Sequence, residues 1–213
     1  MAKKYTKKEE VLNGVTHGIG VVFGIVALTL LLYYAIKARN VSSIVGFSIY
    51  GVCIIMMFLS STLYHSFTID KVKQILRVFD HSSIFLFIAG TYTPIVLLTL
   101  EGRLRIVMLV AIWAIAIFGI AFKILTYGRY EKYKVFSLLL YIGMGWLAVF
   151  PVKYIINATG IHFFYWILLG GLLYTIGTIF YANKRIPYNH AIWHLFVLAA
   201  SVSQFLGIFF YLA

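Results

Sequence analysis

The chain has 213 residues, of which 62% are hydrophobic and only 11% are charged, and its formal net charge is +12. A soluble domain of this length leaves most of its residues in contact with water, so this composition excludes a soluble protein and predicts an integral membrane protein. The basic residues lie in short gaps between apolar stretches, which indicates anionic membrane lipid, and not nucleic acid, as the partner. The single cysteine, Cys53, excludes a disulfide framework.

Seven apolar stretches follow one another along the chain, and each is long enough to cross a hydrocarbon layer of about 30 Å. A lipid-exposed backbone must satisfy its own hydrogen bonds, so each stretch is expected to be a helix. We therefore predict an all-α bundle of seven transmembrane helices in a single domain, 1–213, with sequential helices as neighbours. The predicted spans are about 13–36, 42–65, 80–100, 105–125, 135–157, 162–182 and 188–212.

The lysines and arginines predict the orientation of this bundle. The N-terminal tail and alternate gaps carry thirteen of them, and the gaps on the other side carry five. The tail contributes Lys3, Lys4, Lys7 and Lys8. Because cytoplasmic loops carry the basic excess, the N-terminus is predicted to be cytoplasmic and the C-terminus outside. The apolar run after the tail is too long for a signal peptide, so none is predicted.

Polar side chains that are unusual in a membrane gather near the predicted cytoplasmic face. They lie at the ends of four spans: His17, Ser61, His65, Asp80, His81, His190 and His194. The sixth histidine, His162, lies at the outer side and is expected in a loop. An ionisable group inside a membrane is costly and usually marks a site with a specific partner. The stretch GRYEKYK, residues 128–134, is predicted to be a solvated cytoplasmic loop.

The spacing of the histidines favours a metal site. His190 and His194 are four residues apart, so both rings project from one helical face, and Ser61 and His65 share this spacing. Three neutral imidazoles suit a metal ion with one open position, and zinc is the predicted metal. Alternatives stay open, since a lone buried histidine is more often a hydrogen-bonded packing residue. Asp80 directly before an apolar run also fits a helix N-cap.

Four motifs, in order, resemble those of the progestin and adipoQ receptor superfamily. They are EVLNGVTH (Glu10, Asn13, Thr16, His17), STLYH (Ser61, His65), FDHSSIFLFIAGTYTP (Asp80, Gly90, Thr91, Pro94) and HAIWHLFV (His190, His194, Val197). All four occur in register over seven spans, so the resemblance covers nearly the whole chain. The small size and short loops look like the bacterial branch of this superfamily, called haemolysin III.

The resemblance implies a seven-helix protein of the bacterial plasma membrane, with zinc near the cytoplasmic leaflet. Its metal ligands would be His65, His190 and His194. Asp80 would hold or deprotonate the metal-bound water, and Ser61 would support the site or stabilise an oxyanion. Two further polar residues near the site would be Asn13 and His17. Relatives often carry another histidine where this chain has Gln204, and we expect Gln204 to lie deep in the membrane, away from the metal.

Three functions are consistent with this pattern. The first is a zinc-dependent hydrolase of a lipid amide, similar to a ceramidase, because the superfamily includes adiponectin receptors linked to ceramidase activity. Most bacteria lack ceramide, so the substrate would be another acyl lipid. The second is a receptor-like regulator of membrane homeostasis, in which zinc is structural and joins helices. The third is the pore-forming activity that the name haemolysin suggests, although an absent cleavable signal argues against a secreted toxin. The sequence identifies no protein partner.

Overall fold

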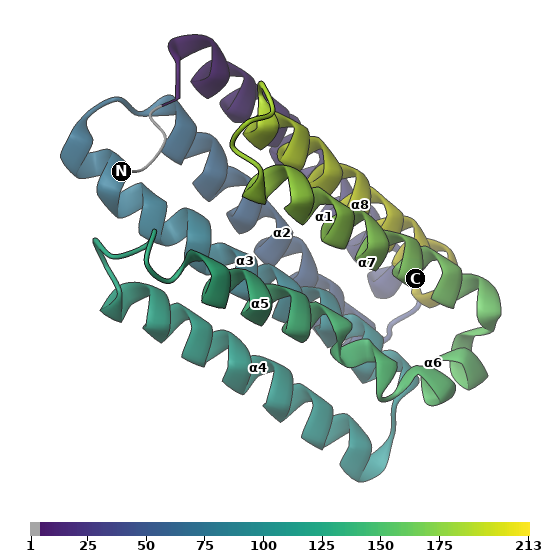
Figure 1. Ribbon diagram of the computed structural model, residues 1–213. Helices are drawn as coiled ribbons and strands as arrows, with labels where there is room; N and C mark the ends of the chain where they lie inside the picture. The colour runs from purple at the N-terminus through teal and green to yellow at the C-terminus, as the bar shows by residue number, and fades with distance from the viewer. Residues whose placement is uncertain (1–4) are drawn as a thin grey trace.

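The computed structural model describes residues 5–213, and over this range the chain forms helices and no strands (Figure 1). This architecture confirms the predicted all-α membrane bundle. Lys3 and Lys4 of the basic tail lie outside the described residues. The helices in chain order are α1 (Lys7–Lys37), α2 (Val41–Ser66), α3 (Asp70–Thr99), α4 (Gly102–Leu125), α5 (Lys134–Gly145), the 3₁₀ helix η1 (Trp146–Val149), α6 (Val152–Thr159), α7 (Ile161–Ala182) and α8 (Asn189–Leu212).

Among the described helices, six are each long and apolar enough to cross a membrane. The bent pair formed by α5–η1 and α6 counts as a seventh if it is one crossing, and its two parts meet at 54°. Most bounds agree with the predicted spans to within a few residues. The helix α1 begins at Lys7, about six residues before the predicted 13, and two further differences affect the candidate site and its cavities.

The first of these two differences is the start of the third span, which was expected at 80–100 but begins at Asp70. Lysines and an arginine interrupt the first turns of α3, so no apolar run marks them in the sequence. A helix satisfies its own backbone whether or not it lies in hydrocarbon, and it continues through these turns. Asp80 and His81 consequently lie about three turns inside α3. The N-cap position belongs to Ile69, so a capping role for Asp80 is wrong.

The second difference is the predicted span 135–157, which is broken in its middle. Pro151 has no backbone N–H and cannot continue the hydrogen-bond pattern of the preceding helix. The Tyr92 hydroxyl of α3 lies in the break, where it donates to the Gly145 carbonyl at 2.7 Å and accepts from the Ala148 amide at 2.7 Å. A broken helix is tolerated inside a membrane when neighbouring side chains satisfy the freed backbone groups in this way.

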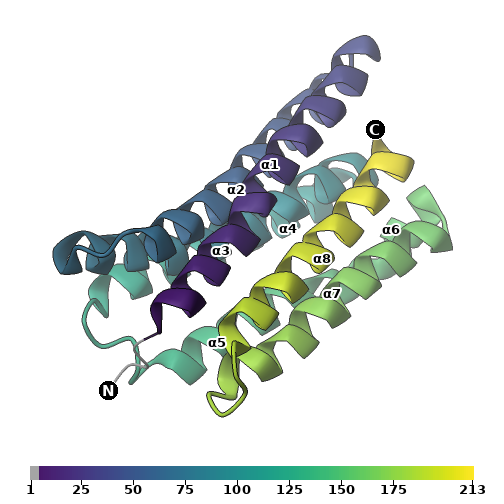
Figure 2. The same ribbon diagram turned by 90° about the horizontal axis from the view of Figure 1, so that it is seen from above.

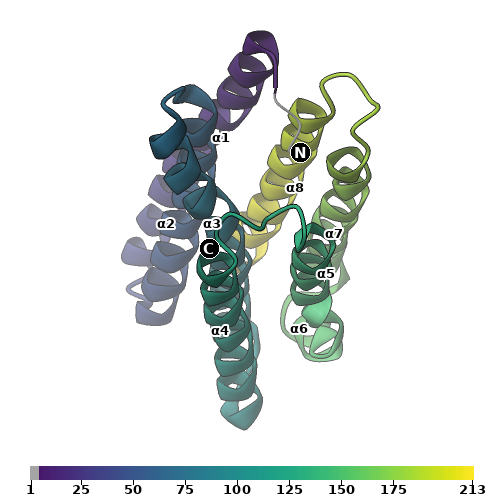
Figure 3. The same ribbon diagram turned by 60° about the vertical axis from the view of Figure 1, so that its left-hand side comes forward.

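The helices pack with α3 near the centre of the bundle. Consecutive helices α1 to α4 are neighbours, α7 packs on α8, and α8 returns to contact α1, whereas α4 and α5 touch only slightly. Figures 2 and 3 show α1 and α2 on one side of the bundle and α7 and α8 on the other. Glycine allows the closest approach of α2 and α3, since a Cβ on Gly90 would lie 2.6 Å from the Cβ of Cys53.

The two ends of the bundle differ in charge. The start of α1 and the α2–α3, α4–α5 and α7–α8 connections gather at one end, which we call the basic end (Figure 1). Its connections include Lys132, Lys184 and Arg185. This is the end that the distribution of lysine and arginine predicts to be cytoplasmic.

Candidate metal centre

Three histidines meet inside the basic end of the bundle. His65 lies in the last turn of α2, and His190 and His194 lie in the first two turns of α8. All three are buried, and one ring nitrogen from each lies within 4.8 Å of the others. The Nε2 atoms of His65 and His190 are 3.2 Å apart. Two histidine nitrogens that bind one tetrahedral zinc at about 2.0–2.1 Å lie roughly 3.3 Å apart, so this separation fits a shared ion.

Hydrogen bonds to α1 set the tautomers of two of these rings. His65 Nδ1 lies 2.6 Å from Glu10 Oε2, and His194 Nδ1 lies 3.1 Å from the Asn13 carbonyl oxygen. Carboxylate and carbonyl oxygens only accept, so each Nδ1 donates and each Nε2 keeps a free lone pair. Metal-binding histidines commonly make such a bond through the nitrogen that faces away from the ion.

The Nε2 atom of His194 gives an independent test of whether a metal fits. It is buried and has no hydrogen-bond partner among the described residues. A buried polar atom normally has a partner, because desolvation without one costs about 1–3 kcal/mol. The unsatisfied lone pair points to a cation as its partner. Three neutral imidazole nitrogens are also the ligand set that zinc favours, so these residues fit the metal that the sequence predicts.

Glu10 is the member of this site that the sequence analysis placed only within a motif. Its carboxylate joins His65 to Lys73, whose Nζ lies 2.8 Å from Oε1. A capping box between Thr6 and Glu9 starts α1 just before it. The spacing of Glu10 with Asn13, three residues later, puts both on the helical face that meets His65. That spacing is the signal that could have identified Glu10 from the sequence.

The structure places the two further polar residues, Asn13 and His17, on the same face of α1. The His17 ring stacks on His194 with centroids 3.5 Å apart, and neither of its buried nitrogens has a hydrogen-bond partner among the described residues. The Asn13 amide nitrogen lies 3.5 Å from His65 Nδ1. His17 is not part of the compact three-histidine group. His162 lies far from this site along the chain, exposed in the first turn of α7 rather than in a loop.

Asp80 and Ser61 are buried near the histidines, on α3 and α2. The two helices are joined beside them, because Ser83 Oγ donates to the Asp80 carbonyl oxygen and lies 2.8 Å from Ser60 Oγ. Asp80 does not join the three-histidine group, so its carboxylate is not a fourth ligand in this arrangement. The Ser61 hydroxyl, one turn before His65, has no hydrogen-bond partner at ordinary distance among the described residues, but it lies close enough to the Asp80 carboxylate to favour its charged form.

Two cavities adjoin this site, and a third lies deeper in the bundle. A polar cavity of about 90 Å³ at the basic end includes Asp80 and His190 in its lining, and an apolar cavity of about 130 Å³ includes Asp80 and His17. The apolar cavity shares Gln204 with a distal cavity of about 150 Å³ beside the broken helix. Asp80 therefore lies where polar and apolar space meet. Gln204 lies deep in the bundle, outside the three-histidine group.

Tyr5 covers the polar cavity from the N-terminal side. Its ring centroid lies 5.1 Å from that of His190. Burial raises the pKa of the Tyr5 phenol above its usual value, so the hydroxyl stays protonated at physiological pH. The site is thus screened from the cytoplasmic side by an aromatic ring.

Comparison with known proteins identifies the family of this chain. A family profile described as Haemolysin-III related matches residues 5–205. The chain belongs to the haemolysin III family. Among its haemolysin III relatives, the Hemolysin-3 homolog of Bacillus subtilis is 45% identical over 207 residues, which is 97% of this chain and 96% of the relative. Hemolysin-3 of Bacillus cereus is 45% identical over 99% of this chain and 97% of the relative.

A more distant similarity extends beyond bacteria. The human monocyte to macrophage differentiation factor is 34% identical over 170 residues, covering 77% of this chain and 69% of that protein. These matches confirm the resemblance that the four motifs indicated. They also support a multi-pass protein of a bacterial membrane, as its apolar helices predicted.

Proposed function

We propose that this protein is a zinc-dependent hydrolase that cleaves an amide bond of a membrane lipid. The observation that carries the proposal is the Nε2 atom of His194, which lies beside His65 and His190 and has no hydrogen-bond partner within residues 5–213. A site with three histidine ligands keeps one position for water or substrate, which is the usual arrangement of catalytic zinc. Asp80 supports the same proposal, because it lies beside the histidines in the walls of both the polar and the apolar cavity.

The residues of the chain have distinct roles in this proposal. Zinc held by His65, His190 and His194 would supply a Lewis acid that polarises the lipid carbonyl and acidifies water. The Asp80 carboxylate accepts a proton from the attacking water as the new C–O bond forms. It returns that proton to the leaving nitrogen as the C–N bond breaks, which yields a fatty acid and an amine. The Ser61 hydroxyl donates to the oxyanion, and the apolar cavity holds the acyl chain.

A second function remains supported by one observation. A bound ion would join α2 and α8 through His65, His190 and His194, and hydrogen bonds from His65 to Glu10 and from His194 to Asn13 would link this pair to α1. A structural zinc of this kind suits a regulator of membrane state that performs no chemistry. Removal of the ion would then loosen the bundle without loss of a catalysed reaction.

Metal analysis and turnover of the purified protein test these functions. We expect about one zinc per chain in the wild type and none in His190→Ala, with His162→Ala as the matched control at an exposed position. Asp80→Asn should keep zinc and reduce hydrolysis of fluorescent acyl-amide lipids by about 10²–10⁴-fold. Full zinc in His190→Ala would contradict the ligand assignment. Equal turnover in Asp80→Asn and wild type would contradict the hydrolase.

Lysis of erythrocytes by the same variants shows whether the pore-forming activity requires the metal.

A further inference from the structure

The polar cavity at the basic end is lined by more cations than anions. Four basic side chains face it, from α3, α4, α5 and the α7–α8 connection, and only two carboxylates do. The basic residues are Arg77, Lys123, Lys134 and Lys184, and the acidic residues are Asp80 and Glu131. The cavity therefore carries a formal excess of two positive charges. A positive excess between membrane helices on the cytoplasmic side is the setting in which proteins bind anionic lipid head groups.

Lys123 is a buried cation of this cavity, and the Asp80 carboxylate in the same lining attracts it without forming a salt bridge among the described residues. Its side chain is buried, its Nζ donates to Ser137 Oγ at 2.6 Å, and the rings of Tyr130 and Tyr141 lie within 6 Å of it. Among residues 5–213, no carboxylate forms a salt bridge with Lys123. A buried ammonium is costly unless an anion pairs with it. Two more buried donors, Arg77 Nε and the Tyr130 hydroxyl, also have no described partner.

Glu131 is the second carboxylate in the lining of this cavity, besides Asp80. Its two carboxylate oxygens bind Arg77 and Lys184, each at 3.2 Å. Tyr130, next to it, is buried and stacks on His81 of α3, with ring centroids 5.5 Å apart. The stretch 128–134 is thus not simply a solvated loop, as the sequence suggested. It contributes Tyr130, Glu131 and Lys134 to the lining of the polar cavity.

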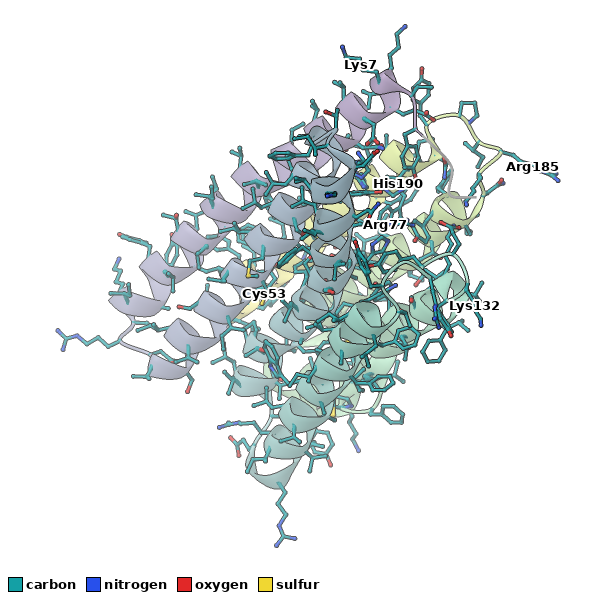
Figure 4. All side chains as sticks on the ribbon, turned by 90° about the vertical axis from the view of Figure 1, so that its left-hand side faces the viewer. Lys7, Cys53, Arg77, Lys132, Arg185 and His190 are labelled. Atoms are coloured by element: carbon teal, nitrogen blue, oxygen red, sulfur yellow. The ribbon has the colours of Figure 1, made fainter. Side chains whose placement is uncertain are left out.

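Arg77 differs in direction from other basic residues at the same end. Figure 4 shows Arg77 within the bundle near His190, whereas Lys132 and Arg185 extend from its edge. Of these three, only Arg77 is among the described residues that line the polar cavity. Orientation in the membrane requires basic residues at this end but does not require them to point inward.

The polar cavity lies next to the apolar cavity. It shares Asp80, Ile84 and Trp193 with the apolar cavity, so one ligand can occupy both. We propose that the polar cavity binds the phosphate group of an acylated lipid whose chain lies in the apolar cavity. Arginine and lysine side chains converging from several helices suit the several oxygens of a phosphate.

This inference rests on the proposed function in one respect, that the lipid in these cavities is the substrate. The substrate would then be an acyl lipid that carries a phosphate close to the bond that is cleaved, and not a neutral ceramide. Binding of the phosphate itself does not require zinc or turnover. The inference and the hydrolase can therefore fail separately.

Lipid binding to the purified full-length protein tests the inference. Native mass spectrometry would compare retention of dioleoyl phosphatidic acid, the diacylglycerol with the same chains, and inorganic phosphate. We expect phosphatidic acid to bind at least about tenfold more tightly than either of the others. Diacylglycerol lacks the charged oxygens that accept from arginine and lysine, and inorganic phosphate lacks a chain for the apolar cavity. Arg77→Ala/Lys184→Ala should abolish this preference. Lys132→Ala/Arg185→Ala removes the same charge outside the cavity and should preserve it.

Lys123→Met separates binding from folding. Methionine keeps the volume and removes the buried charge, so the melting temperature of the lipid-free protein should not fall, while phosphatidic acid retention should fall about tenfold. Equal retention of phosphatidic acid and diacylglycerol would overturn the inference, as would equal losses in the two double variants. Inorganic phosphate bound as tightly as phosphatidic acid would overturn the lipid as its source. A protein that contains zinc but shows no phosphate preference would leave the hydrolase intact.

Discussion

The two ends of the bundle differ in the kind of side chain that they bury. At the end opposite the basic end, the core consists of large apolar side chains that are fully buried or nearly so, such as Leu31, Phe47, Leu100, Phe163 and Ile208. At the basic end, the core instead contains Asn13, His17, Ser61, His65, Asp80, Lys123, His190 and His194. Both ends are built from the same helices, so helix formation alone does not explain the difference.

The end opposite the basic end contributes chiefly to stability, whereas the basic end holds the candidate site. Lipid chains are as apolar as leucine, so the opposite end is stabilised chiefly by close packing. The basic end buries polar groups at a cost, and several of their atoms are unsatisfied. Such a cost is consistent with a site that gains its partners from a bound ion or ligand. Variants at the basic end should therefore change the zinc content, and variants at the opposite end should change the stability.

The largest expected effect is on the metal. His194→Ala removes the ring with the unpartnered Nε2 and should reduce zinc from about one ion per chain to nearly none, because three-histidine sites rarely hold zinc with two ligands. Elemental analysis of the purified protein measures this. If the variant retained stoichiometric zinc, the metal would have to bind elsewhere. The basic end would then not differ from the opposite end by holding the metal.

A core variant at the opposite end should show the reverse signature. Phe47→Ala leaves a cavity where a fully buried ring packs and should destabilise the protein by about 3–5 kcal/mol. Zinc content should be unchanged, since the site lies at the other end of α2. Thermal unfolding in detergent, followed together with elemental analysis, checks both. Loss of zinc in the folded Phe47→Ala protein would show that the two ends are coupled.

A variant of Glu10 tests whether its carboxylate supports metal binding by His65. Glu10→Gln keeps a hydrogen-bond acceptor for His65 Nδ1 but removes the carboxylate charge that supports the ring. Loss of such a support typically weakens metal binding by about 10–100-fold. Competition with a zinc chelator of known affinity measures the change. Glu9→Gln, one residue earlier in α1, is the control, and equal weakening in both variants would exclude a specific role for Glu10.

The change that we expect to matter least is at Glu131, in the lining of the polar cavity. Partial burial opposes ionisation of Glu131, but Lys184 and Arg77 hold the pKa of its carboxyl below the usual value. A carboxyl with a lowered folded-state pKa adds stability above its unfolded pKa of about 4.3, and this stability is lost as the pH falls through the folded-state pKa.

Glu131→Gln should therefore lower stability at pH 7 by less than about 1 kcal/mol, because the carboxylate is partly exposed. The difference between variant and wild type should shrink once the pH falls below the unfolded pKa of about 4.3 and vanish below the lower folded-state pKa of Glu131. Melting temperatures measured from pH 3 to pH 7 show this, with Glu101→Gln at the opposite end as the control. A difference that grows as the pH falls would contradict the assigned sign.

Much of the fold follows from the sequence because the membrane restricts the choices. Helices are the only structure that an isolated apolar segment can adopt in lipid, so most span ends were predicted to within a few residues. The start of α3 was not, because hydropathy does not mark helical turns that extend beyond the hydrocarbon. The break near Pro151 was also missed, because it depends on the Tyr92 hydroxyl, which reaches it from another helix.

The amino-acid sequence alone was enough to predict the class of protein, which end of the bundle is basic, and which histidines could bind a metal. These features are local, since composition, charge and spacing along one helix are properties of the chain alone. Only the tertiary structure decided that Glu10 supports His65, that Asp80 separates polar from apolar space, and that four basic side chains share one cavity. Those relations join residues from different helices, and the packing of the helices sets their distances.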